Sequence, residues 1–377
     1  MDNSSPKQEP EYVAPSADVP QLQQKRLYAT YIRAIAACAV VQMHSIGTYL
    51  YQYDPAKPTD VHFVTSDVFY GFLRWATPFF IMISGALQLH ASRPEPTAVF
   101  LKKRLQRVLV PFLFWGTVYA LYLFRGEMYF GTGPSWERFV EVIFYQDIYF
   151  HLWFIPMIAG LYIFTPALRV FVRSATRREL EYFIGLILAV NALHHFLPGF
   201  FMIKHFAWFG YVGYYLLGYY LSAYPISWQW KRVVYPLALL MPLLTAFGTW
   251  WLTVRKGTYD ESIYIYASPN VLLMTAALFL FLKDVDWVAF SSRYPRIHRA
   301  AGYMAQVSYG VYFIHPIVLD VLKNGYIFGQ HINPHSFFNY PLHPALAGPM
   351  VAVLAIGISV GLITLMGKSG TLKKWIM

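Results

Sequence analysis

Long apolar stretches recur along most of the chain and alternate with shorter polar segments. Most of them approach the roughly 20 residues that a helix needs to cross a bilayer. They lie near residues 29–50, 68–90, 108–125, 152–172, 180–197, 205–222, 233–254, 268–283, 303–322 and 345–366. This pattern predicts an all-α integral membrane protein, built as a bundle of about ten transmembrane helices.

Two segments depart from this pattern. Residues 1–24 are rich in Pro, Ser, Gln and acidic side chains and have no periodicity, which predicts a disordered cytoplasmic tail. The remaining residues, 25–377, are then expected to form one transmembrane domain. Residues 136–150 (WERFVEVIFYQDIYF) are amphipathic, and such a segment is typical of a helix that lies along the membrane interface.

Composition supports a membrane protein and excludes an ordinary soluble domain. The chain of 377 residues is 57% hydrophobic and 13% charged, against roughly 25% charged residues in soluble domains. Its one cysteine, Cys38, rules out an intramolecular disulfide and a zinc site built on cysteines.

The formal net charge of +11 is explained by topology and does not predict nucleic-acid binding. Most of the 30 lysines and arginines precede the first apolar stretch or fall in alternate loops, as the positive-inside rule requires. Both termini are therefore expected in the cytoplasm, and the chain is expected to be a multi-pass protein of the plasma (inner) membrane.

The first apolar stretch carries two polar residues, Arg33 and His44. At about 100° per residue they share one stripe of a helix, separated by about 16 Å along its axis. Ionisable residues inside a membrane usually face the bundle interior or a watery cavity. The stripe therefore predicts a polar path. A second reading remains open, in which Arg33 reaches the headgroups and His44 only bonds a neighbouring helix.

A basic turn precedes the third apolar stretch, at residues 100–112 (FLKKRLQRVLVPF). Arg104 and Arg107 share one helical face because they are three positions apart, and Lys102 and Lys103 are next to them. Guanidinium groups at this depth suit a phosphorylated ligand on the cytoplasmic side. The alternative is simple anchoring to anionic lipid headgroups.

Together these features resemble acyltransferase family 3, the integral-membrane acyltransferases that modify surface sugars. The resemblance runs from about residue 27 to 366, and the variety with "HLWF" is similar to the stand-alone O-acetyltransferases of enterobacterial common antigen and exopolysaccharides. It is carried by Arg33 with His44, by Arg104 with Arg107, by PFFIMISGALQL at 78–89, by HLWFIPMIAGLYIFTPALR at 151–169 and by VSYGVYFIHP at 307–316.

The resemblance implies a reaction and roles for matching residues. An acyl group would pass from cytoplasmic acyl-CoA, the donor and cosubstrate, to a hydroxyl of a sugar in a surface polysaccharide or its lipid-linked precursor. His44 would be the essential base. Arg33 would help to hold the acyl donor, or the polar stripe of the helix, in place. Arg104 and Arg107, with Lys103 beside them, would engage the phosphates of the donor. Acetyl-CoA is favoured, with succinyl or longer chains as alternatives, and both direct transfer and an acyl-His44 intermediate stay open.

Four further residues are candidates for contacting the acceptor: His151, Trp153, Tyr309 and His315. Each has a structural alternative. A tryptophan at this depth commonly anchors a helix at the interface. His151, near Asp147, could cap the following helix. His315 precedes Pro316, and a proline within a helix leaves a carbonyl free that the imidazole could bond.

Other classes of protein also remain possible readings of the sequence. A proton-coupled transporter of a small polar substrate could use an intramembrane arginine and histidine, and a polyprenyl-phosphate glycosyltransferase could use the acidic residues of the outer loops. No metal is predicted, because the loop histidines are irregularly spaced. A homo-oligomer is left open. The loop histidines are His331, His335 and His343.

Overall fold

The structure of the chain is a computed structural model, and it describes residues 19–90, 95–145, 148–197, 209–324, 326–327, 330–331 and 342–376. Within these ranges the fold is helical apart from one short antiparallel pair, β1 (Tyr326–Ile327) and β2 (Gln330–His331). The α-helices are α1 (Val19–Ile46), α2 (Val61–Leu73), α3 (Ala76–Gln88), α4 (Thr97–Leu123), α5 (Arg125–Tyr129), α6 (Trp136–Tyr145), α7 (Phe154–Ser174), α8 (Arg177–Phe196), α10 (Phe209–Ala223), α11 (Trp228–Lys256), α12 (Pro269–Asp284), α13 (Trp287–Arg293), α14 (Pro295–Asn324), α15 (Pro344–Met366) and α16 (Gly370–Ile376).

Six helical segments in the described ranges are long and apolar enough to cross a membrane. They are Gln23–Gln52, Phe154–Ser174, Trp228–Lys256, Ser262–Asp284, Pro295–Lys323 and Pro344–Met366. The predicted class, an all-α multi-pass membrane protein, is confirmed at this level. The predicted number of about ten spans is not, and the side on which each terminus lies stays a prediction.

The missing spans have local explanations. The stretch expected at 68–90 is divided between α2 and α3, which have 13 residues each. The helix α4 opens with the basic turn, α8 opens with charged residues, and the described part of α10 has 15 residues, directly after residues 198–208, which lie outside the described residues. These helices stand where four of the predicted spans were expected, but none of them combines the length and the mean hydropathy of the six segments named above.

The break between α2 and α3 falls at Arg74 and Trp75. Pro78 follows four residues after Arg74, and a proline has no N–H to donate to the carbonyl four residues before it. The interruption turns Arg74 inward, where its Nε donates a hydrogen bond to the carbonyl of Tyr264 at 2.6 Å. The apolar stretch that the sequence predicts as one span, 68–90, therefore carries a buried arginine near its start, where the helix is interrupted.

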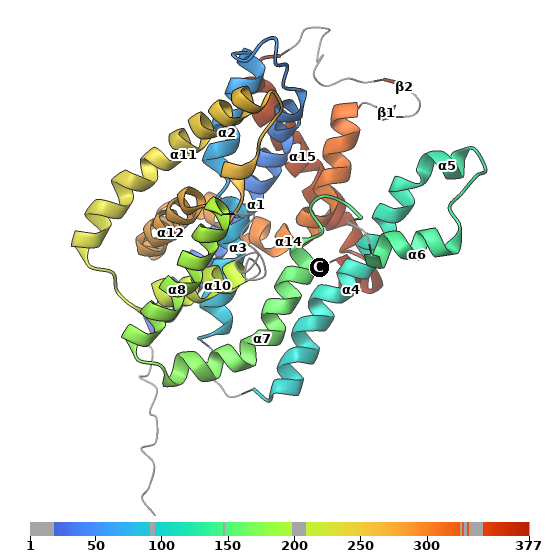
Figure 1. The fold of residues 1–377 in the computed structure, drawn as a ribbon. Helices are drawn as coiled ribbons and strands as arrows, with labels where there is room; N and C mark the ends of the chain where they lie inside the picture. Colours follow the sequence, from blue (N-terminus) through green and yellow to red (C-terminus); the bar gives the residue numbers. More distant parts are fainter. Residues whose placement is uncertain are drawn as a thin grey trace, which may run out of the picture.

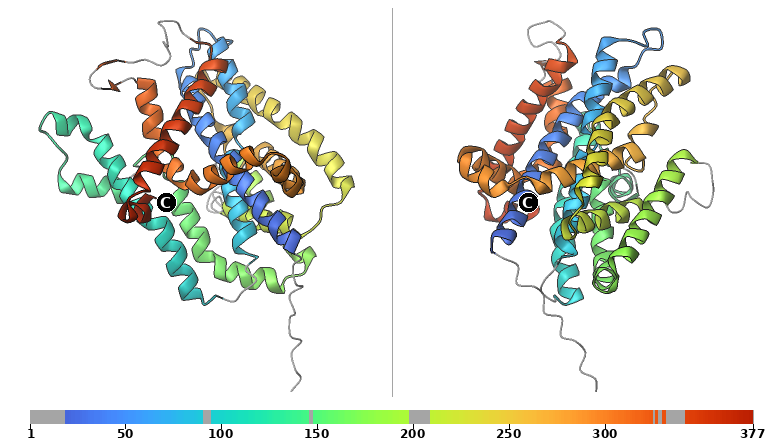
Figure 2. Two further views of the ribbon diagram at one scale, coloured as in Figure 1. Left: turned by 180° about the vertical axis from the view of Figure 1, so that it is seen from behind. Right: turned by 90° about the vertical axis from the view of Figure 1, so that its left-hand side faces the viewer.

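The helix α1 runs through the centre of the bundle (Figures 1 and 2) and packs against α14, α15 and α3. It begins at Val19, so residues 19–24 of the predicted tail are helical, and residues 1–18 lie outside the described residues. Residues 136–145 of the predicted interfacial segment form the amphipathic helix α6.

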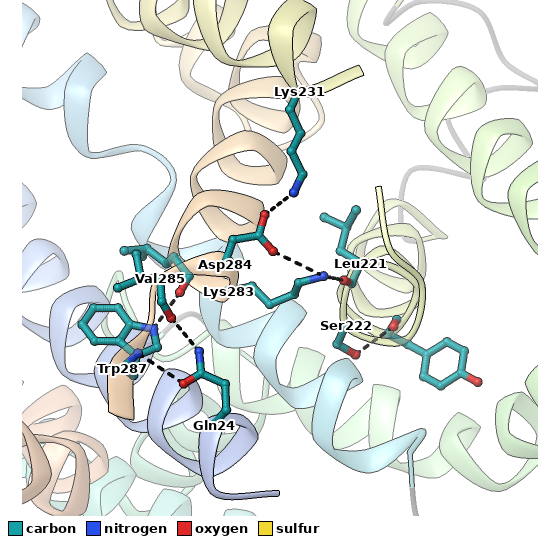
Figure 3. A network of polar contacts seen from close by, with 10 residues as sticks. Gln24, Leu221, Ser222, Lys231, Lys283, Asp284, Val285 and Trp287 are labelled. Carbon is teal, nitrogen blue, oxygen red and sulfur yellow. Dashed lines mark hydrogen bonds and ion pairs between the residues drawn. The ribbon is translucent and has the colours of Figure 1, made fainter. Parts of the chain in front are cut away.

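Gln24, near the start of α1, bonds the segment between α12 and α13, and a neighbouring ion pair joins α11 to the end of α12 (Figure 3). Gln24 donates to the carbonyl of Val285 at 2.5 Å and accepts from the backbone N–H of Trp287 at 3.2 Å. Beside it, Lys231 pairs with Asp284 at 2.5 Å. The two bonds of Gln24 tie α1 to the segment between α12 and α13, and the Lys231–Asp284 pair joins α11 to α12.

The helices α3 and α10 approach each other closely at two glycines. A Cβ added to Gly85 would lie 1.8 Å from the carbonyl oxygen of Tyr215, and one added to Gly218 would lie 2.0 Å from that of Met82. Small residues permit this approach of two backbones. The contact places the neighbouring Ser84 at the edge of an internal cavity.

Candidate active site

Two cavities open inside the bundle on either side of His44. The smaller, of about 250 Å³, is lined by Arg33, Arg104 and Arg107 and is called the basic cavity below. The larger, of about 1030 Å³, is lined just after the end of α1 by Gly47, Thr48 and Tyr51, and is called the wide cavity. Along α1, the basic cavity therefore lies before His44 and the wide cavity beyond it.

Three residues line both cavities: His44, Trp153 and Tyr266. His44 comes from α1, Trp153 precedes α7, and Tyr266 lies in the loop before α12. A group bound in one cavity and a group bound in the other would thus meet at the His44 imidazole. The stripe that sequence predicted on α1 faces inward, because Arg33 and His44 line the same cavity.

His44 is bonded to a second histidine, His315 of α14. Nδ1 of His44 lies 2.8 Å from Nε2 of His315, and Nδ1 of His315 lies 2.9 Å from the carbonyl oxygen of Val311. The rings are nearly parallel, with 5° between their planes. The bonded carbonyl belongs to the same helix as His315, but Val311 lies five residues before Pro316, whereas a proline removes the donor of the carbonyl four residues before it.

This chain of bonds fixes the tautomer of His44 when both rings are neutral. A carbonyl only accepts, so Nδ1 of His315 must carry a proton, and its Nε2 must then accept one. Nδ1 of His44 is therefore the donor in the bond between the rings. Nε2 of His44 keeps its lone pair and has no protein partner among the described residues, which leaves it able to take a proton from a ligand.

His151 lies deeper than the sequence suggested. Its residue is 3% exposed, it lines the basic cavity, and neither ring nitrogen has a hydrogen-bond partner among the described residues. The ring stands edge-on to that of His315 with 5.8 Å between centroids. The alternative that it caps α7 is wrong, and its expected neighbour Asp147 lies outside the described residues.

Trp153 and Tyr309 also lie in the site. The Trp153 ring stacks near that of Tyr266 with centroids 5.8 Å apart, so it forms part of the cavity wall and not only an interfacial anchor. Tyr309 lines the basic cavity, and its hydroxyl donates to the carbonyl of Val108 at 3.3 Å.

The basic turn of α4 divides into residues that face the basic cavity and residues that do not. Arg104 and Arg107 line it, and the buried Nε of Arg104 has no partner among the described residues. Lys103 does not line it: its side chain is 67% exposed and lies 3.8 Å from Glu95. One residue along a helix is a rotation of about 100°, which turns Lys103 away from the arginines.

The basic cavity holds three guanidinium groups, and no Asp or Glu of the described residues lines it. Three cations in one low-dielectric pocket repel one another and attract an anionic ligand. Arginine forks suit phosphate because they can donate two parallel hydrogen bonds. The pocket can therefore bind the phosphate-bearing part of a ligand whose other end reaches His44.

Sequence reasoning missed several residues of the site. Arg74 and Tyr266 were not singled out, and Lys323 donates to the carbonyl of His44 at 2.6 Å and to the hydroxyl of Thr48. The only available signal was a cation within an apolar stretch. Among the loop histidines, His343 accepts from the N–H of Ala345 at 3.3 Å as the N-cap of α15.

The fold and the site define a multi-pass membrane protein with a polar reaction site inside its helical bundle. A family model described as an acyltransferase domain matches residues 26–365, so the chain belongs to acyltransferase family 3 and is a membrane acyltransferase. No curated protein and no solved structure gave a significant match to the chain.

Proposed function

We propose that the protein transfers an acyl group, acetyl in the first instance, from acyl-CoA to a hydroxyl of a sugar. The acceptor is part of a surface polysaccharide or its lipid-linked precursor, and the reaction takes place in the inner membrane. The observation that carries this proposal is the position of His44, whose unprotonated Nε2 lies where two cavities meet. The donor occupies the basic cavity and the acceptor reaches His44 through the wide one.

The dimensions of the basic cavity suit one end of the donor. A volume of about 250 Å³ is below the roughly 300 Å³ at which pockets for whole small molecules begin. Only the acyl thioester and part of the pantetheine arm would fit inside. The nucleotide would stay at the rim, where Arg104 and the exposed Arg107 can pair with its phosphates.

His44 acts as a general base in this proposal. Nε2 takes the proton of the sugar hydroxyl while the hydroxyl oxygen attacks the thioester carbonyl. Collapse of the tetrahedral intermediate expels the CoA thiolate, which takes the proton back from His44. His151, with both ring nitrogens unpartnered, is placed to donate to the carbonyl oxygen as negative charge develops there. An acyl-His44 intermediate would use the same atom as nucleophile.

The direct test is incubation of membranes that contain the protein with isotope-labelled acetyl-CoA and a panel of lipid-linked sugars. Mass spectrometry is expected to find acetylated sugar and free CoA in equal amounts. Substrate uptake driven by a pH gradient, with no dependence on any short acyl-CoA, would instead indicate a transporter and refute the proposal.

Removing the two cavity-facing arginines is expected to weaken donor binding. In the Arg104→Ala/Arg107→Ala variant the KM for acetyl-CoA should rise by about 100-fold or more, because each lost charged hydrogen bond is worth roughly 1.5–3 kcal/mol. Lys102→Ala is the matched control, since Lys102 lies on the same turn but is exposed and lines neither cavity. An equal rise in KM for the control would show that the turn acts only through its charge.

His315 is expected to be a positioning residue that acts through His44. His315→Phe keeps an aromatic ring at this position but removes the hydrogen bond to His44. We therefore expect kcat to fall by about 10- to 100-fold with little change in the KM for acetyl-CoA. His315→Gln, which retains an acceptor, should recover part of the rate. A pH–rate profile is the deciding measurement: the acid limb should move in the Phe variant, and an unchanged profile would contradict the role.

A further inference from the structure

Arg74 faces the wide cavity at the junction of α2 and α3, and the proposed reaction gives it no role. The residue is 9% exposed. Its Nε bonds the carbonyl of Tyr264, and its Nη1 lies 3.3 Å from the hydroxyl of Tyr70 and 3.7 Å from Sδ of Met43. Nη2 makes no hydrogen bond within the described part of the chain.

No carboxylate of the described residues lies within 4.0 Å of this guanidinium. Two acidic residues line the wide cavity, but Glu261 is exposed and Asp320 accepts a hydrogen bond from the hydroxyl of Tyr122. An unpaired buried charge is costly, because burial removes its hydration without replacing it by a counterion. The arrangement leaves room for an anion supplied by a ligand.

Aromatic rings compensate part of that cost. The Arg74 guanidinium carbon lies 4.3 Å from the ring centroid of Tyr266, 5.3 Å from that of Tyr70 and 5.8 Å from that of Tyr264. Ring faces attract a cation, but they carry no net charge and leave it positive overall. They also hold the guanidinium in one orientation, which fixes the direction in which Nη2 can donate.

We infer that the wide cavity binds its acceptor through an anionic oxygen that pairs with Arg74. This inference rests on the proposed function and adds the class of acceptor: a glycan that carries a carboxylate or a phosphate. Lys323 supplies a second positive charge from α14. Because Nη1 touches Met43, the residue before His44, an anion at Arg74 would hold the neighbouring sugar beside the base.

The wall of the wide cavity also fits a sugar. Trp153 and Tyr211 line it with Tyr266, and the Trp153 ring lies 5.7 Å from that of Tyr211 at 35°. Aromatic faces of this kind present apolar surface to the C–H face of a pyranose. In this arrangement the Arg74 guanidinium selects an anionic acceptor, and the aromatic rings orient its sugar.

The test compares matched acceptors in an acetyl-transfer assay with the full chain in lipid nanodiscs. The acceptors are a methyl glucuronide, its neutral methyl ester, and a glucose linked to a polyprenyl diphosphate. The wild type is expected to prefer a charged acceptor over the ester by about 10- to 100-fold in kcat/KM. Preference for the glucuronide identifies a sugar carboxylate as the anion, and preference for the lipid-linked sugar identifies the diphosphate.

Variants of Arg74 separate recognition from folding. Arg74→Gln should erase the preference, raising KM for the charged acceptor by about 10- to 100-fold while the ester reacts as before. Arg74→Lys keeps the charge and should retain part of the preference. Arg255→Gln removes an exposed arginine from the end of α11 and should change nothing. Equal losses with charged and neutral acceptors would overturn the inference.

Equilibrium binding keeps the inference testable if no transfer is seen. Labelled glucuronide and labelled polyprenyl-diphosphate glucose should each be measured against the neutral ester on the same nanodiscs. Tighter binding of an anionic ligand, lost in Arg74→Gln, would support the anion site even if acyl transfer failed. Equal binding of all three ligands would overturn it, whereas transfer to neutral and charged sugars alike would refute the acceptor class and leave the proposed function intact.

Discussion

Replacing His44 with alanine is expected to lower acyl transfer by about 100- to 10,000-fold, the usual contribution of a general base. The physical reason is that the bond to His315 leaves Nε2 of His44 as the proton acceptor where the two cavities meet. The loss should appear in kcat. The KM for acetyl-CoA should change little, because the arginines of the basic cavity remain.

The measurement is turnover of labelled acetyl-CoA in membranes, with the amount of inserted protein determined in the same samples. His90→Ala is a suitable control, since His90 lies outside both cavities and bonds Ser222 at 3.0 Å near the end of α3. The control is expected to turn over at the wild-type rate. Wild-type turnover in His44→Ala would remove the histidine from the mechanism.

Adding one methyl group at Gly85 is expected to have the largest effect on stability. The Cβ of Gly85→Ala would lie 1.8 Å from the carbonyl oxygen and 2.7 Å from the carbonyl carbon of Tyr215, so α3 and α10 must move apart. Overpacking typically costs 1–3 kcal/mol, and a clash with rigid backbone belongs at about 3 kcal/mol or above. The separation would also displace Ser84 at the basic cavity.

Thermal unfolding in detergent checks this prediction. Gly160→Ala on α7 is the matched control, because a Cβ there meets nothing within 4 Å, and alanine favours a helix over glycine by up to about 1 kcal/mol. The control should be as stable as the wild type or slightly more stable. If Gly85→Ala unfolded at the same temperature as Gly160→Ala, the two helices would separate without a cost in stability, and the prediction would be wrong.

The two cavities suggest how the bundle can bring together reactants from different compartments. In the proposed reaction, the donor would reach His44 through the arginine-lined cavity before it and the acceptor through the wide, aromatic cavity beyond it, from opposite directions. Neither reactant would need to cross the bilayer in the proposed reaction. In the proposed reaction, the helices hold the His44 imidazole, bonded to His315, at the junction of the two cavities.

The local pattern along single helices was enough to predict which residues share a face. Arg33 and His44 could be paired from spacing, because helix geometry repeats along a single element, and the same reasoning grouped Arg104 with Arg107. Lys103 was grouped with them only because it adjoins Arg104 in sequence, and it projects to solvent, as a rotation of about 100° per residue requires. The long apolar stretch at 68–90 predicted one span, because hydropathy averaged over a window does not register the break at Arg74.

The sequence by itself determined that the protein is a helical membrane acyltransferase and which face of its first helix is polar, because both depend on local composition, periodicity and family motifs. Only the tertiary structure decided what those residues meet. His315 is 271 positions from His44 and Tyr264 is 190 from Arg74. Such contacts arise when separate helices pack, and no spacing along one helix encodes them. The tautomer of His44 and the unpaired charge of Arg74 follow from that packing.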